Sequence, residues 1–294
     1  MFSGLLKEEK TKETPLCERI NQAVRLIDKA EAVVIGAGAG LSTAAGLDFG
    51  GERFEKYMHD FGEKYGYHDM YSGDFYHYDT LEEYWAFEAK SIFANRYDTK
   101  ALPLYEKLYR LVKDRNYFVI TTNVDHQFYK AGFPKQRVFA TQGDYGLFQC
   151  AKGCHKKLYD NEAAVMEMVK ETKDLKIPSR LLPKCPVCGG EAKANLRADE
   201  YFVEDEEWDK ACKRYETFIK EISGKDVVYL EFGIGYNTPG IIRYPFEQMT
   251  YKNPLAHLIR FNKDYPYGAA ENEEKTIRFT EDINMLLEKM YPNV

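Results

Sequence analysis

A short apolar segment that runs directly into a glycine-rich turn constrains the fold of this chain more than any other feature. EAVVIG (Glu31–Gly36) has the length and composition of a buried strand, and GAGAGLSTAAG (Gly36–Gly46) follows it. The small residues of Leu41–Gly46 suit a helix that packs close to a sheet and a ligand. A strand, a glycine turn and a helix in this order are typical of a parallel α/β sheet.

Further helices and strands alternate along the 294 residues. Apolar residues at helical spacing predict helices at Leu16–Ala30, Thr80–Asn95, Leu102–Lys113, Asn161–Lys173, Glu206–Ile222 and Asp282–Met290. Short apolar runs predict strands at Glu31–Gly36, Tyr117–Thr121, Arg137–Thr141, Val227–Phe232, His257–Phe261 and Thr276–Phe279. The stretch Phe49–Asp79 has no lasting period, so we expect an irregular connection there. The pattern predicts an α/β fold with a Rossmann-like parallel sheet and helices on both faces.

Charge and hydropathy exclude several classes of protein. The net charge is −6 and no concentrated basic run is present, which argues against a nucleic-acid partner. No stretch approaches the roughly 20 apolar residues that span a bilayer. The first fifteen residues lack the apolar core of a signal peptide. We therefore expect a cytoplasmic protein with no membrane partner.

Two close pairs of cysteines predict a metal site. The pairs are Cys150 with Cys154, and Cys185 with Cys188. Four thiolates in this arrangement suit a tetrahedral, structural Zn²⁺, although His155 could compete for one ligand position and free thiols are the alternative. The segment between the pairs has its own charged helix, so it is interpreted as a zinc-ribbon module inserted into the parent domain. We expect the other cysteines, Cys17 and Cys212, to be buried as small hydrophobic side chains.

Two glycine-rich turns are candidates for contact with a ligand. At Gly36–Gly46, backbone without Cβ atoms can approach a pyrophosphate, and a helix N-terminus favours its negative charge. The turn departs from the G-x-G-x-x-G dinucleotide pattern at Leu41, so a purely structural turn is the alternative. LEFGIGYNTPG (Leu230–Gly240) is a second apolar segment that runs into a glycine turn. Gly233 and Gly235 have no Cβ atoms, so the backbone there can also approach a ligand closely.

Polar side chains follow two of the predicted strands. TTNVDH (Thr121–His126) places Asn123 and Asp125 where open parallel sheets bind ligands, although these residues could merely cap a following helix. In RFN (Arg260–Asn262) the asparagine could reach a ribose or could be a turn residue.

Taken in order, these motifs resemble the sirtuin family from about Ala32 to Leu287. GAGLS with the following Thr43, Gly46, Asp48 and Phe49 matches the family segment GAGIS-x-x-x-GIPDFR, and TTNVD matches TQNID. The cysteine pairs match the zinc ribbon, FGIG looks like the GTS turn, and RFN looks like the I-N strand end. The resemblance implies one catalytic domain (1–294) with a small helical module (50–98) and a zinc-binding insertion (147–197).

The resemblance also implies NAD, consumed as a substrate, and structural Zn²⁺. The cofactor-binding residues that it implies are Gly38, Ala39, Gly40, Ser42, Thr43, Asp48, Phe49, Thr122, Asn123, Asp125, Gln142, Gly233, Ile234, Gly235 and Asn262. Asn123 resembles the asparagine that orients the ribose and the attacking group. Asp125 resembles the aspartate that binds the nicotinamide carboxamide.

Three departures from the family pattern matter for the reaction. GLDFGG (Gly46–Gly51) lacks the proline and arginine of GIPDFR, and Thr122 replaces a glutamine. Where sirtuins place a catalytic His-Gly, this chain reads ATQGDYG (Ala140–Gly146), with Gln142 before Gly143. Sirtuins break the nicotinamide–ribose bond first, and the histidine then acts as the general base that completes deacylation. A glutamine amide can only donate and accept hydrogen bonds, so deacylation should be crippled while NAD cleavage survives.

This combination is similar to microbial sirtuins whose genes accompany a macrodomain and a lipoyl carrier. The resemblance implies an NAD-dependent protein mono-ADP-ribosyltransferase that uses Asn123, Asp125 and Gln142, with a lipoylated H-protein-like carrier as acceptor and a macrodomain hydrolase as a further partner. Residual deacylase or delipoylase activity is the alternative reaction. A non-catalytic NAD-binding adaptor would leave Asn123 and Asp125 without a role. An α/β protein with a zinc knuckle and an unrelated ligand is the remaining alternative. The segment Tyr57–Tyr78 is either an acceptor-binding lid or a packed connection.

Overall fold

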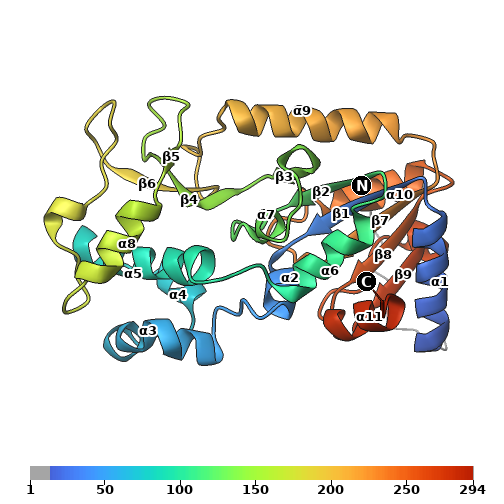
Figure 1. Ribbon diagram of the computed structural model, residues 1–294, viewed down its shortest axis with the longest axis horizontal. Helices are drawn as coiled ribbons and strands as arrows, with labels where there is room; N and C mark the ends of the chain where they lie inside the picture. The colour runs from blue at the N-terminus through green and yellow to red at the C-terminus, as the bar shows by residue number, and fades with distance from the viewer. Residues whose placement is uncertain (1–13, 294) are drawn as a thin grey trace.

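Six parallel strands form the central sheet of the larger of two lobes in the computed structural model, which describes residues 14–293 (Figure 1). The spatial order is β3-β2-β1-β7-β8-β9. The strands are β1 (Ala32–Ala37), β2 (Tyr117–Thr121), β3 (Val138–Ala140), β7 (Val227–Phe232), β8 (His257–Phe261) and β9 (Thr276–Phe279). All neighbours pair in parallel, so the predicted Rossmann-like sheet is confirmed. Strand order reverses beside β1, which is where open sheets of this type bind ligands.

Helices cover both faces of this sheet, as the alternation of side chains along the strands requires. In β1, Val33 and Ile35 pack into one hydrophobic cluster while Ala32 and Val34 pack into the cluster on the opposite face. The first face is covered by α1 (Leu16–Lys29), α6 (Pro103–Val112) and α11 (Ile283–Met290), and the second by α9 (Glu206–Glu221) and α10 (Arg243–Lys252). Short helices α2 (Ala39–Ala44) and α7 (Gln127–Lys130) follow β1 and β2.

The smaller lobe is built from two separate segments that share one hydrophobic core (Figure 1). The first segment holds α3 (Gly51–Tyr65), α4 (Met70–Asp74), α5 (Leu81–Ile92) and the π-helical turn η1 (Phe93–Tyr97). The second holds α8 (Glu162–Glu171) and an antiparallel sheet of β5 (Tyr159–Asp160), β4 (Gly143–Cys150) and β6 (Ala192–Leu196). Phe54, Phe61 and Trp85 from the first segment meet Phe148 and Val165 from the second. The chain therefore crosses between the lobes four times.

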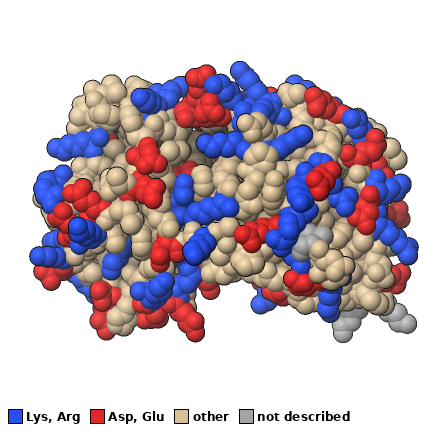
Figure 2. All heavy atoms as spheres, viewed as in Figure 1, with Lys and Arg blue, Asp and Glu red and all other residues tan. Residues whose placement is uncertain are grey.

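Short 3-10 turns complete the connections, at η2 (Lys135–Arg137), η3 (Ser179–Leu181) and η4 (Ala270–Lys275). Among residues 14–293, no helix combines the length and the apolar composition that crossing a membrane takes. On the face seen in Figure 2, acidic and basic side chains are interspersed rather than gathered by sign. Cys17 is exposed and Cys212 is half-buried, so the expectation that both are buried was wrong.

The prediction of an irregular connection over Phe49–Asp79 was wrong in its larger part. Residues 51–65 form α3, in which Phe54, Met58 and Phe61 are buried at helical spacing. The many Gly, His, Tyr and Asp residues hide this period in the sequence, and packing against α5 supplies the stability that intrinsic propensity does not. Gly66 ends the helix in the left-handed conformation, with φ +78°.

Other elements were also absent from the prediction, among them α10, β4 and β6. Helix α10 contains Pro245, which is tolerated because it lies in the first turn, where backbone N–H groups have no partner within the helix. Strands β4 and β6 pair with each other across a bulge between Asp144 and Phe148, and their sequences alternate poorly. The predicted start of the helix at Thr80 is confirmed, because Thr80 Oγ1 caps α5 by accepting a hydrogen bond from Glu83 N at 3.3 Å.

Candidate active site

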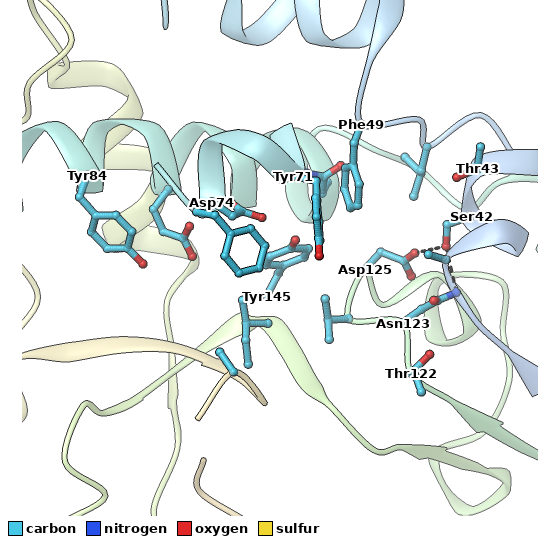
Figure 3. A pocket seen from close by; sticks show the side chains of 18 residues that line it. Ser42, Thr43, Phe49, Tyr71, Asp74, Tyr84, Thr122, Asn123, Asp125 and Tyr145 are labelled. Atoms are coloured by element: carbon cyan, nitrogen blue, oxygen red, sulfur yellow. Dashed lines mark hydrogen bonds between the residues drawn. The ribbon is translucent and has the colours of Figure 1, made fainter. Parts of the chain in front are cut away.

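A pocket of about 340 Å³ opens where the carboxyl ends of β1 and β2 face the smaller lobe (Figure 3). Its lining residues are Ala39, Ser42, Thr43, Leu47, Phe49, Tyr71, Asp74, Phe75, Tyr84, Glu88, Asn95, Thr122, Asn123, Val124, Asp125, Tyr145, Leu196 and Ala198. The larger lobe contributes α2 and the loop after β2, and the smaller lobe contributes α4, α5, β4 and β6. The pocket thus lies at the position that the sheet order predicts for a ligand.

Asn123 is held rigidly at one end of this pocket. Its amide Nδ2 donates to the Gly38 carbonyl oxygen and to Ser42 Oγ, each at 3.0 Å, and lies 3.2 Å from Tyr105 Oη. Its backbone N–H donates to Thr121 Oγ1 at 3.0 Å. These contacts fix the side chain with its Oδ1 oxygen left to accept a hydrogen bond.

Asp125 lies beside Asn123 in the same hydrogen-bonded set. Ser42 Oγ donates to Asp125 Oδ2 at 2.5 Å and the Gln127 backbone N–H donates to Oδ1 at 3.0 Å. Burial raises the pKa of Asp125, and these hydrogen bonds oppose the shift. Tyr105 Oη contacts Ser42 Oγ at 2.8 Å, and burial together with the Asp125 charge raises the pKa of Tyr105. A tyrosine in this position keeps its proton, so it acts as a hydrogen-bonding support.

The two glycine turns pack against each other. A Cβ atom at Gly40 would lie 2.7 Å from the Gly233 Cα atom, and one at Gly38 would lie 2.9 Å from the Gly233 carbonyl oxygen. Gly233 itself has φ +60° and accepts a hydrogen bond from Gly40 N at 3.1 Å. The absence of side chains at these positions therefore has a packing reason, and a role in binding a cofactor stays a prediction.

The structure brings about half of the predicted cofactor-binding residues to the pocket. Those that line it are Ala39, Ser42, Thr43, Phe49, Thr122, Asn123 and Asp125. Those that do not line it are Gly38, Gly40, Asp48, Gln142, Gly233, Ile234, Gly235 and Asn262. Asn262 is a turn residue here, since its Nδ2 donates to the Ile234 carbonyl at 2.8 Å and its Oδ1 accepts from Tyr265 N at 2.9 Å.

Gln142 lies in the turn between β3 and β4, outside the lining of the pocket. Its side chain is half-buried, and its backbone carbonyl oxygen accepts a hydrogen bond from the backbone N–H of Arg197 at 3.1 Å. The following Gly143 is fixed by packing, because a Cβ atom there would lie 1.8 Å from the Asn195 carbonyl oxygen. Gly143 also lines a small neighbouring recess together with Asn123 and Asp125. Gln142 is thus adjacent to the catalytic candidates without sharing their hydrogen bonds.

One polar cluster beside the site was not predicted. His126, at φ +66°, contacts the Asp144 carboxylate through Nδ1, and Arg96 Nε donates to Asp144 Oδ1 at 2.9 Å. Burial would raise the pKa of Asp144, but His126 and Arg96 lower it overall. The cluster ties the loop after β2 to η1 and β4, and nothing in the local sequence pattern pairs these residues.

The far half of the pocket was also missed by the sequence analysis. It carries Glu88 and Asp74 together with the phenol rings of Tyr84 and Tyr145. Figure 3 shows Tyr84 and Asp74 toward one end of the pocket, Ser42 and Asn123 at the other, and Tyr145 between them. Helix α5 was predicted, but helical spacing alone does not reveal that Glu88 faces inward.

The four paired cysteines converge as predicted. Their sulfur atoms all lie within 4.8 Å of one another, and the Cys150–Cys188 and Cys154–Cys185 distances are both 3.7 Å. A tetrahedron with Zn–S bonds of about 2.3 Å has edges of roughly 3.8 Å, so the cluster fits a structural Zn²⁺. His155 is not one of the four ligands; its Nδ1 lies 3.1 Å from Cys154 Sγ and its Nε2 lies 2.9 Å from Tyr159 Oη.

Two curated proteins are similar in sequence. A protein ADP-ribosyltransferase of Staphylococcus aureus is 38% identical over 285 residues, which are 97% of this chain and 89% of that protein. A probable bifunctional ADP-ribose hydrolase/ADP-ribosyltransferase of Fusarium oxysporum f. sp. cubense is 30% identical over 86% of this chain, and the chain spans 44% of that longer protein. Searched against models of known protein families, the chain matches none.

Solved structures of sirtuins share the fold. One sirtuin described in terms of substrate affinity aligns with a TM-score of 0.58 at 18% identity, covering 92% of this chain and 97% of that chain. Another, Sir2Tm bound to a propionylated peptide, aligns with a TM-score of 0.59 at 17% identity, covering 93% and 97%. At this identity the likeness concerns the fold, and the reaction has to be argued from the site.

Proposed function

Because the chain belongs to the NAD-dependent protein ADP-ribosyltransferases and has the sirtuin fold, we propose that it transfers a single ADP-ribose to a lipoylated carrier protein resembling the H-protein. The observation that carries the proposed chemistry is the single hydrogen-bonded set of Asn123, Ser42 and Asp125 at one end of the pocket. The acceptor follows from the resemblance to sirtuins that accompany a macrodomain and a lipoyl carrier. The Fusarium relative, whose name joins a hydrolase with a transferase, supports a hydrolase that acts on the product.

The residues of this set have distinct proposed roles. NAD supplies a glycosidic carbon–nitrogen bond that breaks with nicotinamide leaving, and a new bond then joins ribose C1 to an oxygen of the acceptor. Asn123, fixed by three contacts, orients the ribose and the incoming oxygen through its free Oδ1. Asp125 binds the carboxamide of nicotinamide. An acceptor carboxylate is already ionised at neutral pH, so transfer needs no general base at position 142.

The remaining site predictions belong to this proposal. The glycine turns at Gly38–Gly40 and Gly233–Gly235 are assigned to the adenosine diphosphate part of NAD, with Asp48 and Asn262 at its margins. Residues 50–98 form the helical module and residues 147–197 the zinc-binding insertion of one catalytic domain (1–294). Five residues between positions 71 and 88 line the pocket. Their position supports the interpretation of this part of the helical module as a portion of the acceptor site.

Labelling of the carrier tests the acceptor directly. The enzyme is incubated with NAD labelled in the adenine ring and with an H-protein that either carries or lacks lipoyl. We expect label only on the lipoylated carrier, and mass spectrometry is expected to place one ADP-ribose on an Asp or Glu. Equal labelling of both carriers would exclude lipoyl as the recognition element. Release of nicotinamide without label on either would show that the acceptor is a different protein.

Replacing Gln142 by histidine tests the role of the missing base. Gln142→His is expected to weaken transfer or to restore some deacylation, because general-base help is worth about 10²- to 10⁴-fold in that reaction. Transfer is measured with the labelled carrier and deacylation with an acyl-lysine peptide. The matched control is Gln136→His, the same change at an exposed position of the connection between β2 and β3. If Gln142→His alters neither rate, Gln142 has no part in catalysis.

A further inference from the structure

The half of the pocket farthest from Asn123 has a composition that the diphosphate of NAD does not explain. Of the residues that line the pocket, Asp74, Glu88 and Asp125 are acidic and none is basic. Asp125 is already engaged by Ser42 and by the Gln127 backbone. The diphosphate of NAD is anionic, and like charges repel strongly in a low-dielectric cavity. The acidic half is therefore suited to a different chemical group.

Glu88 is the central observation. It is 4% exposed, it faces the pocket, and its carboxylate makes no hydrogen bond or ion pair with any of residues 14–293. An ionised carboxylate buried without a partner costs several kcal/mol, so such a group is normally paired. Burial raises the pKa of Glu88 to about 7, which leaves it largely charged only above neutral pH. A positively charged ligand would supply the missing partner.

The surroundings of Glu88 define the shape and chemistry of that ligand. Asp74 lies at the exposed rim, yet burial of its carboxyl and the Glu88 charge raise its pKa well above the ordinary value. The rings of Tyr71, Phe75, Tyr84 and Tyr145 line the same pocket as the two carboxyl groups. Aromatic faces attract cations, and a pocket lined by aromatic rings and acidic groups suits an organic ammonium ion better than a hydrated metal ion.

From these contacts we infer that the acidic half of the pocket binds the protonated primary amine of a lysine side chain on the acceptor protein. Val124, Leu196 and Ala198 offer apolar walls for the methylene chain of such a residue. The occupant's identity as part of the acceptor rests on the proposed function, whereas the preference for a cation rests on the pocket alone. A bound lysine would anchor the acceptor while a second residue meets the ribose near Asn123.

Binding of small probes tests the site without any turnover. Titration calorimetry at pH 8 compares Nα-acetyl-lysine methylamide with the uncharged Nα-acetyl-norleucine methylamide. We expect the lysine probe to bind the wild-type protein at least about tenfold more tightly. Glu88→Gln and Asp74→Asn should each weaken the lysine probe by about tenfold or more, and Glu63→Gln, an exposed change on α3, should not. Equal binding of the two probes, or full affinity in Glu88→Gln, would overturn the inference.

The pH dependence gives an independent readout. The groups that face Glu88 are Asp74 from α4, Tyr84 from α5 and Tyr145 from β4. The lysine probe keeps its charge throughout, since its pKa is about 10.4. Affinity should therefore fall between pH 8 and pH 6 as Glu88 gains a proton, and this fall should be smaller in Glu88→Gln, where only Asp74 can still titrate. An affinity independent of pH in the wild-type protein would contradict the role of Glu88.

Two controls separate this inference from the proposed function. Glu88→Gln removes a buried carboxyl without a partner, so its melting temperature should equal or exceed that of the wild type; if it unfolds, Asp74→Asn at the rim carries the test. In the carrier assay, the lysine probe should inhibit labelling. Labelling that persists with the probe at saturation contradicts the inference while the proposed function stands. Probe binding with no labelled carrier contradicts the proposed acceptor while the cation site stands.

Discussion

Replacing Asn123 by alanine is expected to lower the rate of nicotinamide release from NAD by about 10²- to 10³-fold, the usual effect of losing one preorganised polar group at a reaction centre. The side chain is held by Gly38, Ser42 and Tyr105, so the protein presents it without further rearrangement. The alanine variant removes the free Oδ1 oxygen and also the hydrogen bond that Asn123 Nδ2 donates to Ser42 Oγ. Release is measured by chromatography of nicotinamide, with and without the carrier.

The matched control for this experiment lies just before β2, whereas Asn123 lies just after it. Asn116 is exposed at the amino end of β2, opposite the pocket, so Asn116→Ala should leave the rate unchanged. Melting temperatures distinguish a chemical effect from partial unfolding, because Asn123→Ala loses hydrogen bonds worth about 1 kcal/mol each. A folded Asn123→Ala enzyme that releases nicotinamide at the wild-type rate would remove Asn123 from the mechanism.

Replacing Cys185 by serine should remove the bound zinc and lower the melting temperature by at least about 10 °C. A structural zinc site contributes on the order of 10 kcal/mol in small modules, and a few kcal/mol already shift melting of a protein of this size by that amount. Cys185 lies close to β6, which pairs with β4 and leads to Leu196 and Ala198 in the pocket wall. Transfer activity should therefore fall together with the zinc content.

Metal analysis and thermal unfolding check this prediction. Cys212→Ser is the matched control, because this half-buried cysteine of α9 is remote from the sulfur cluster and should keep one zinc per chain. Addition of a chelator to the wild type should reproduce the effect of Cys185→Ser. If Cys185→Ser retains zinc and melts like the wild type, the four sulfur atoms do not form the ligand set.

The central sheet could be predicted because its strands have a local signal. Tyr117–Thr121, Val227–Phe232, His257–Phe261 and Thr276–Phe279 were predicted with the bounds that the structure has. These strands are short apolar runs that end at turn residues, and helices flank them. Helix α3 and strands β4 and β6 gain their stability from the core that they share across a long interval of sequence, which no local pattern reveals.

The site was predictable only where its residues form contiguous motifs. Ser42, Asn123 and Asp125 lie in two glycine- or polar-rich segments, and parallel strand ends bring such segments together. Glu88 belongs to helix α5, in which eight of the twelve residues are buried, and whether it faces a neighbouring helix or a cavity depends on tertiary packing. For Asn262 the sequence left both a ribose contact and a turn role open, and in the structure its side-chain amide holds a turn.

Because the chain crosses between the lobes four times, the two segments of the smaller lobe are synthesised at different times, and this limits the order in which that lobe can fold. Phe54 and Trp85 leave the ribosome before Phe148 and Val165, which complete the same core. Helices α3 to α5 therefore keep an uncovered apolar face until β4 and α8 have been synthesised. Domains normally fold as units during synthesis, and exposed apolar surface of this kind promotes aggregation. A nascent or truncated chain that stops before β4 is accordingly expected to aggregate, whereas one that extends beyond β6 can complete the core of the smaller lobe.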